Sequence, residues 1–153
     1  MEKILIRLPA DRTQLGNLCI VDDNSTILFG PIACLGKSDN EAALQHNNVK
    51  RLSIYPYGDT PLGDYVPARI SAHAPPGDMG NRVIWLQGLD GDALVAASNG
   101  RLGLAIHAGR GDTGGPYSGL FPTDGCVRIS DTSMDALALF MGDNVLPISV
   151  VQA

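Results

Sequence analysis

Short apolar runs, each closed by turn-forming residues, recur along the whole chain. They span roughly four to eight residues, a length typical of β-strands and too short for most amphipathic helices. The segments between them draw on 18 glycines and 10 prolines, which favour tight turns. The pattern predicts strands at residues 3–8, 17–22, 26–35, 64–72, 82–87, 102–107, 126–129 and 144–151. A chain of this kind folds into a mostly β domain, not a helical bundle.

Two helices are expected between these strands. The first lies near residues 38–47, where Ser38 and Glu41 have capping-box spacing. The second lies near residues 131–141, where four apolar residues fall at helical spacing on one face: Met134, Leu137, Ala138 and Met141. The sequence has no repeat and no linker, and 153 residues suffice for one core, so residues 1–153 are predicted to form a single domain.

The charge balance narrows the class of partner. The chain carries 16 acidic and 11 basic residues, a net charge of −5, and has no basic cluster. An acidic chain gains no electrostatic attraction to nucleic acid or anionic membranes, so the expected partner is a small molecule, a peptide or a protein.

The start of the chain does not read as a secretory signal, because Arg7 interrupts a short apolar run. No segment approaches the roughly 18 apolar residues of a membrane span. The expectation is a protein made in the cytoplasm, which stays there, leaves by a route that reads no such peptide, or has lost a leader.

Three cysteines are present, and an odd number excludes a complete disulfide framework. Cys19 and Cys34 have apolar neighbours and are predicted to be buried strand residues, with a bridge between them left open. No Cys/His pairs have metal-ligand spacing, so neither a metal nor another cofactor is expected.

Cys126 and His107 stand apart because they lie on two expected strands joined by an irregular loop, residues 109–122. A thiol attacks a carbonyl as the thiolate, so it needs a neighbouring base. His107 can take the thiol proton and return it to a leaving amine. Backbone N–H groups around Gly125 and Cys126 can bind the oxyanion. Arg128, two residues further on, shares the strand face of Cys126 and either favours the thiolate, binds a substrate carboxylate or stiffens the strand end.

This stretch resembles the catalytic segment of L,D-transpeptidases, which have a YkuD-type fold. That family carries a His, a spacer and then Ser/Thr-His-Gly-Cys; here His107 is followed by residues 108–122 and by Thr123-Asp124-Gly125-Cys126-Val127-Arg128. The family's Thr-Pro-x-Gly-x-Tyr/Phe segment is matched by Thr60-Pro61-Leu62-Gly63-Asp64-Tyr65. The resemblance covers nearly the whole chain and implies a β-sandwich or barrel-like domain.

The resemblance implies acyl transfer on peptidoglycan stem tetrapeptides, in which Cys126 displaces the terminal D-Ala and the acyl group passes to an amine or to water. It implies catalytic roles for Cys126, His107, Gly125 and Arg128, with a carbonyl around Ala108 orienting the imidazole. Substrate contacts are expected at four further residues: Thr123, Asp124, Tyr65 and Tyr117.

One departure from the family pattern leaves the function open. Asp124 replaces the motif histidine, and an anion beside Cys126 raises the thiol pKa unless it points away. Three hypotheses therefore stand. The first is an active enzyme that acts on the cell wall, either of its own cell or, as an antibacterial effector with an immunity or secretion partner, of a rival cell. The second is a peptidoglycan- or protein-binding module that has lost its activity, and the third is a cysteine amidase that acts on another peptide.

Overall fold

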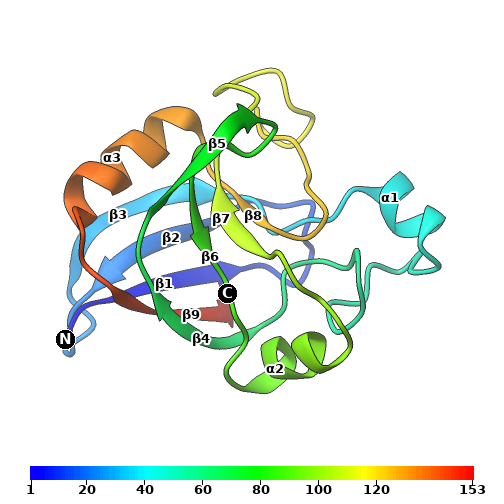
Figure 1. Cartoon of the computed structure of the whole chain (residues 1–153), viewed down its shortest axis with the longest axis horizontal. Helices are drawn as coiled ribbons and strands as arrows, with labels where there is room; N and C mark the ends of the chain where they lie inside the picture. Colours follow the sequence, from blue (N-terminus) through cyan, green and yellow to red (C-terminus); the bar gives the residue numbers. More distant parts are fainter.

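Two β-sheets form the body of the computed structural model, which describes residues 1–153 except the side chain of Pro75 (Figure 1). Over these residues the chain forms nine strands and three helices. The strands are β1 (Lys3–Leu8), β2 (Gly16–Val21), β3 (Ile27–Cys34), β4 (Gly63–Ala68), β5 (Ser71–Gly77), β6 (Gly80–Trp85), β7 (Ala105–His107), β8 (Val127–Arg128) and β9 (Leu146–Gln152). The helices are α1 (Asn40–Gln45), α2 (Gly91–Ser98) and α3 (Asp131–Met141).

The first sheet has the order β3-β2-β1-β9-β4, so strands from the two ends of the chain pair near its centre. β1 runs antiparallel to β2 and parallel to β9, which sets Ile4 between Ile20 and Ile148. Asp22 closes the turn between β2 and β3, because its Oδ1 accepts hydrogen bonds from two turn N–H groups at 2.8 and 2.9 Å. The two strands predicted on either side of this turn therefore pair as an antiparallel hairpin.

The second sheet has the order β5-β6-β7-β8, with β8 parallel to β7 and the other pairs antiparallel. Leu35 and Arg128 exchange two backbone hydrogen bonds of 2.9 Å, so β8 also bonds to the residue that follows β3. The two sheets are therefore joined beside β8.

The sheets share one core, and both end in edge strands instead of closing into a barrel. The fully buried side chains that the two sheets contribute to this core include Ile4, Ile6, Leu18, Ile20, Ile84, Ile106 and Val127. Burying each such side chain stabilises the fold by roughly 1.5–3 kcal/mol before entropy is counted. The mostly β, sandwich-like prediction is confirmed.

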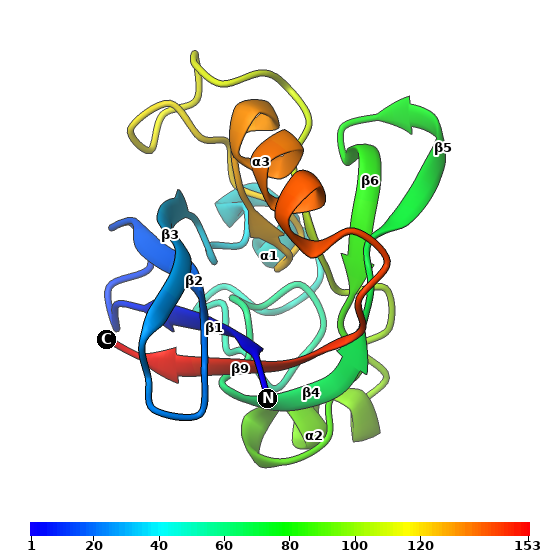
Figure 2. The same cartoon turned by 90° about the vertical axis from the view of Figure 1, so that its left-hand side faces the viewer.

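Helix α3 covers one end of the space between the sheets (Figure 2). It buries Met134, Leu137 and Met141, as the spacing predicted. The Ser130 Oγ accepts the N–H of Ser133 at 3.0 Å and caps the first turn. This helix fixes the end of β8 directly before it.

Helix α1 begins one residue later than the capping-box spacing indicates. Asp39 is the N-cap, and its Oδ1 accepts the Ala42 N–H at 2.9 Å. Ser38 is fully buried, and its hydroxyl donates to the Tyr57 carbonyl at 2.6 Å. The Ser38 hydroxyl therefore holds the loop that contains Tyr57 and does not cap the helix.

Two elements differ from the prediction. The strand expected at residues 64–72 is two strands, because the chain leaves the first sheet after β4 and enters the second at β5. Pro67, which has no N–H to donate, lies in β4 where the register with β9 shifts. Helix α2 was not predicted, because Asp90 and Gly91 indicated only a turn. It is a short helix that packs on β4 and buries its own residues Ala93 and Ala96.

No helix among the described residues is long and apolar enough to cross a membrane.

Candidate active site

The register of β7 and β8 places the two candidate catalytic side chains on one face of the second sheet. In this parallel pair Ile106 lies beside Val127, and His107 lies beside Arg128. Side chains alternate along a strand, so His107, Arg128 and Cys126 share a face, while Ile106 and Val127 lie on the other. The sheet thus brings together two residues that the 109–122 loop separates in sequence.

This face opens into a cleft of about 730 Å³. One wall comes from α1 and the segment after it, through Asp39 and Tyr57, and another from the β5–β6 turn, through Asp78 and Met79. The cleft brings together five of the predicted site residues: His107, Thr123, Asp124, Cys126 and Arg128.

The imidazole of His107 is oriented by the backbone. Its Nδ1 lies 2.7 Å from the carbonyl oxygen of Ala108. A carbonyl only accepts, so Nδ1 carries the proton and Nε2 carries a lone pair. Burial lowers the pKa of His107 to about 4; the bond to Ala108 opposes this shift, and the charge of Arg128 adds to it. At neutral pH the ring is neutral and able to accept a proton.

Cys126 is 8% exposed, and its thiol lies at the cleft surface. Burial is the largest cause that raises the pKa of Cys126, and the carboxylate of Asp124 raises it further. A backbone N–H and the charges of Arg101 and Arg128 act in the opposite direction. At neutral pH the Cys126 side chain is therefore a thiol, and the His107 ring in the same cleft is an uncharged imidazole.

Three hydrogen bonds fix the backbone around Cys126. The Thr60 hydroxyl donates to the Gly125 carbonyl at 2.7 Å, and the Thr123 hydroxyl donates to the Cys126 carbonyl at 2.9 Å. The Gly125 N–H donates to the Thr123 Oγ1 at 2.9 Å. This last bond corrects the expectation that the Gly125 N–H faces an oxyanion, because the Thr123 hydroxyl already accepts it.

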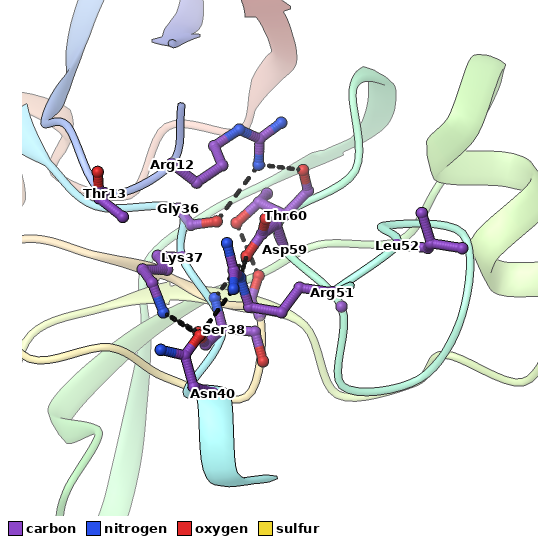
Figure 3. A network of polar contacts seen from close by, with 12 residues as sticks. Arg12, Thr13, Gly36, Lys37, Ser38, Asn40, Arg51, Leu52, Asp59 and Thr60 are labelled. Atoms are coloured by element: carbon purple, nitrogen blue, oxygen red, sulfur yellow. Dashed lines mark hydrogen bonds and ion pairs between the residues drawn. The ribbon is translucent and has the colours of Figure 1, made fainter. Parts of the chain in front are cut away.

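Thr60 also belongs to a polar network with Arg12, Gly36 and Asp59 (Figure 3). The Arg12 Nη1 donates to the carbonyl of Thr60 at 2.8 Å and to that of Gly36 at 3.3 Å. Asp59 accepts the Ser38 N–H at 2.9 Å and pairs with Arg51 at 3.2 Å. Thr60 thus links Arg12, in the connection between β1 and β2, to Gly125, the residue before Cys126.

Arg101 belongs to the site although the sequence did not indicate it. Its side chain lines the cleft and is 6% exposed, and it donates to the carbonyls of Ser53, Gly58, Asp59 and Asp124 at 2.5–3.4 Å. All four acceptors are backbone atoms in loops more than 20 residues away, so no motif marks them. An arginine held only by carbonyls keeps its full charge near Cys126.

Arg128 is held in a similar way and is 3% exposed. Its Nε donates to the Phe121 carbonyl at 3.0 Å, and its Nη1 donates to the carbonyls of Asp78, Ala108 and Gly109 at 2.7–2.9 Å. The hydrogen-bond partners of Arg128 are thus backbone carbonyls from three different segments. Ala108 accepts from both Arg128 and His107, so the two side chains are positioned through one atom.

The loop of residues 109–122 is bonded to α3 at its start. The Gly109 N–H donates to the Asp131 Oδ1 at 2.8 Å, and Asp112 accepts hydrogen bonds from the backbone and hydroxyl of Thr132. Tyr117 is half-buried within it, with the Lys37 Nζ 5.1 Å from its ring centre. The start of the loop is therefore fixed by α3, and Tyr117 lies beside Lys37.

Tyr65 lies in the core and not at the cleft. It is 2% exposed, and its hydroxyl donates to the Pro61 carbonyl at 2.7 Å. Its position explains the Thr-Pro-x-Gly-x-Tyr segment as a folding unit, since the Tyr closes the turn that presents Thr60. Tyr117 contacts Lys37 at the loop, outside the residues that line the cleft.

The three cysteines are free and buried. Cys19 and Cys34 lie in β2 and β3 of the first sheet, in a register that pairs Cys34 with Gly16. Burial raises the pKa of Cys34 to about 12. Of the three thiols, the one that lines the cleft is Cys126.

The fold and cleft define a class: a small two-sheet domain in which His107, at the end of β7, and Cys126, directly before β8, line one cleft. The solved structure of Bd1075 from Bdellovibrio bacteriovorus resembles it with a TM-score of 0.55 and 15% identity, over 97% of this chain and 46% of that one. An L,D-transpeptidase from Mycobacterium smegmatis aligns with a TM-score of 0.44 and 12% identity, over 97% and 58%. No family model and no curated protein matches the sequence.

The chain spans about half the length of the solved structures it resembles. At 15% identity the likeness to Bd1075 shows a shared fold. The chemistry of this chain has to be argued from its own cleft.

Proposed function

We propose that the protein is a cysteine acyltransferase that acts on peptidoglycan stem tetrapeptides, as an L,D-transpeptidase or L,D-carboxypeptidase. The observation that supports this most is the His107 ring, whose Nδ1 is bound to the Ala108 carbonyl while the ring lies in the same cleft as the Cys126 thiol. An imidazole held in this tautomer presents Nε2 as a general base.

The reaction has two halves. Cys126 Sγ bonds to the carbonyl carbon before the terminal D-Ala, and its proton moves to Nε2 of His107. The C–N bond breaks, His107 returns the proton to the departing amine, and a thioester is left. An amine or water then attacks the thioester, gives its proton to His107, and the C–S bond breaks to regenerate the thiol.

The surrounding residues have supporting roles in this proposal. The Cys126 N–H is the backbone donor that we assign to the oxyanion, because the Gly125 N–H is taken by Thr123. Arg101 and Arg128 lower the free energy of the thiolate, since both charges lower the pKa of Cys126 against burial. The substrate lies in the cell wall, so the proposed place of action is outside the cytoplasmic membrane.

The test is mass spectrometry of purified muropeptides incubated with wild type, Cys126→Ala and Cys19→Ala, with and without a D-amino acid. Cys19→Ala is the matched control, because it removes a buried thiol from the other sheet. We expect wild type and Cys19→Ala to remove or exchange D-Ala, and Cys126→Ala to leave the substrate intact. Turnover by Cys126→Ala would refute the nucleophile.

A second function is favoured by one observation. The Asp124 carboxylate raises the pKa of Cys126 in addition to burial, which suits a binding module whose chemistry has lapsed. That function predicts that folded wild type binds stem peptides without turning them over, and that Cys126→Ala binds them equally well.

A further inference from the structure

Two arginine side chains, Arg110 and Arg128, line the cleft together with His107 and Cys126. The Arg110 guanidinium lies 3.8 Å from the ring centre of Phe121, and the carbonyl of the same Phe121 accepts the Arg128 Nε at 3.0 Å. Arg128 also donates to the carbonyl of Gly109, the neighbour of Arg110 in sequence. Both arginines thus contact Phe121, Arg110 through its ring and Arg128 through its carbonyl oxygen.

One edge of the Arg128 guanidinium faces the open cleft. Its Nε and Nη1 donate to four backbone carbonyls, whereas Nη2 has no partner among the described residues. Every buried side-chain nitrogen and oxygen of those residues has a hydrogen-bond partner. Since Arg128 is 97% buried, its unpartnered Nη2 is the part that reaches solvent, and the solvent there is the cleft.

These two charges are not neutralised by a direct partner. Neither guanidinium belongs to an ion pair within the described part of the chain. Burial lowers the pKa of Arg128, and the charge of Arg110 lowers it further, while the carboxylates of Asp78 and Asp131 act in the opposite direction. Holding like charges together costs free energy unless an anion lies between them.

We propose that Arg110 and the Nη2 edge of Arg128 form a carboxylate subsite, which binds the free C-terminal carboxylate of the peptide beside the scissile amide. This rests on the proposed function, because the cleft holds the peptide bond at Cys126. Guanidinium groups match carboxylates in geometry and bind them with charge-assisted hydrogen bonds. The subsite makes a peptide that ends one residue after the scissile bond the preferred substrate class.

The test compares a tetrapeptide that ends in a free carboxylate with the same peptide ending in a carboxamide. Binding is measured by calorimetry with Cys126→Ala, which retains the cleft and lacks the nucleophile. We expect the acid to bind about 10- to 100-fold more tightly than the amide, in line with hydrogen bonds to a charged group. Arg110→Gln removes this preference, Arg110→Lys retains part of it, and Arg69→Gln, an exposed arginine outside the cleft, leaves it unchanged.

Turnover of the two peptides by wild type distinguishes a failure of the subsite proposal from a failure of the acyltransferase proposal. Selective binding of the acid without turnover by wild type supports the subsite and overturns the acyltransferase proposal. Equal turnover of acid and amide supports the chemistry and overturns the subsite. Equal affinity for the two peptides, a preference that survives Arg110→Gln in folded protein, or no binding of either also overturns the subsite.

Discussion

The reactivity of Cys126 depends on its surroundings in the fold, since Cys19 and Cys34 carry the same thiol group. Cys126, Cys19 and Cys34 are all buried, so simple exposure separates them little. What separates them is the cleft, which gives a reagent access to Cys126, and the two nearby arginines, which partly offset the burial that raises its pKa. We therefore expect Cys126 to be alkylated first, although slowly at neutral pH.

The carboxylate of Asp124 gives a sharper prediction. Asp124→Asn removes a negative charge that raises the pKa of Cys126, so the thiolate forms at lower pH. The pH profile of iodoacetamide labelling, read by mass spectrometry, shifts toward lower pH in Asp124→Asn. Asp143→Asn, an exposed carboxylate outside the cleft, is the control and leaves the profile where it was. Identical profiles for wild type and Asp124→Asn would show that the Asp124 side chain is screened from the sulfur.

Thr60 is expected to fix the position of Cys126 through the backbone. Its fully buried hydroxyl is bonded to the Gly125 carbonyl, so Thr60→Val leaves that oxygen without a partner and costs about 1–3 kcal/mol. Thr60→Ser keeps the bond and restores most of the loss. Chemical denaturation measures the stability, and labelling of Cys126 in still-folded protein measures the positioning. A labelling rate equal to wild type in Thr60→Val would limit Thr60 to a role in stability.

At the scale of the element, the candidate site shows what a sequence can and cannot indicate. The strands that carry His107 and Cys126 were predictable, because apolar alternation and turn residues mark them locally. The partners of Arg101 were not, since an arginine that binds backbone carbonyls needs no complementary side chain at any fixed spacing. The role of the Gly125 N–H was mispredicted for a similar reason, since the Thr123 hydroxyl that accepts it was read as a substrate contact.

The Gly125 turn is the element on which the geometry of Cys126 depends. Gly125 has a φ of +116°, and a Cβ there would overlap the Arg101 Nη2 and the Gly58 carbonyl oxygen. We expect Gly125→Ala to cost more than the roughly 1–2 kcal/mol of backbone strain alone, because Arg101 must also move. Gly111→Ala is the matched control, with a φ of +80° and open space around the site of the added Cβ. Equal losses in thermal stability for the two variants would show that Arg101 moves aside freely.

At the scale of the whole molecule, the mostly β sandwich follows from patterns that each strand carries by itself, but its sheet order does not. The parallel pairing of β1 with β9 joins residues more than 140 positions apart and has no local signal. The break between β4 and β5 is likewise a consequence of the chain passing from one sheet to the other. The cleft lies beside β8, which pairs with β7 and bonds to Leu35, both distant in sequence. The sequence could therefore indicate Cys126 and His107, but not the segments that form the walls of the cleft.

The buried imidazole couples the candidate site to global stability, and this gives the last prediction. His107 has a pKa of about 4 in the folded protein, below the 6.5 expected when the chain is unfolded. Between these values the unfolded chain binds more protons, so the free energy of unfolding falls as the pH drops from 6.5 toward 4. The contribution is fully present above pH 6.5, and about 2 kcal/mol of it is lost by pH 5.

The measurement is urea denaturation of wild type and His107→Gln across this range, with His46→Gln, an exposed histidine, as control. Carboxylates titrate in all three proteins, so the difference between wild type and His107→Gln isolates the imidazole. We expect His107→Gln to be less stable at pH 7 and to lose less stability toward pH 5, while His46→Gln follows wild type. Parallel curves for wild type and His107→Gln would mean that the ring has the same pKa in the folded and the unfolded chain, so burial would not be what keeps it neutral.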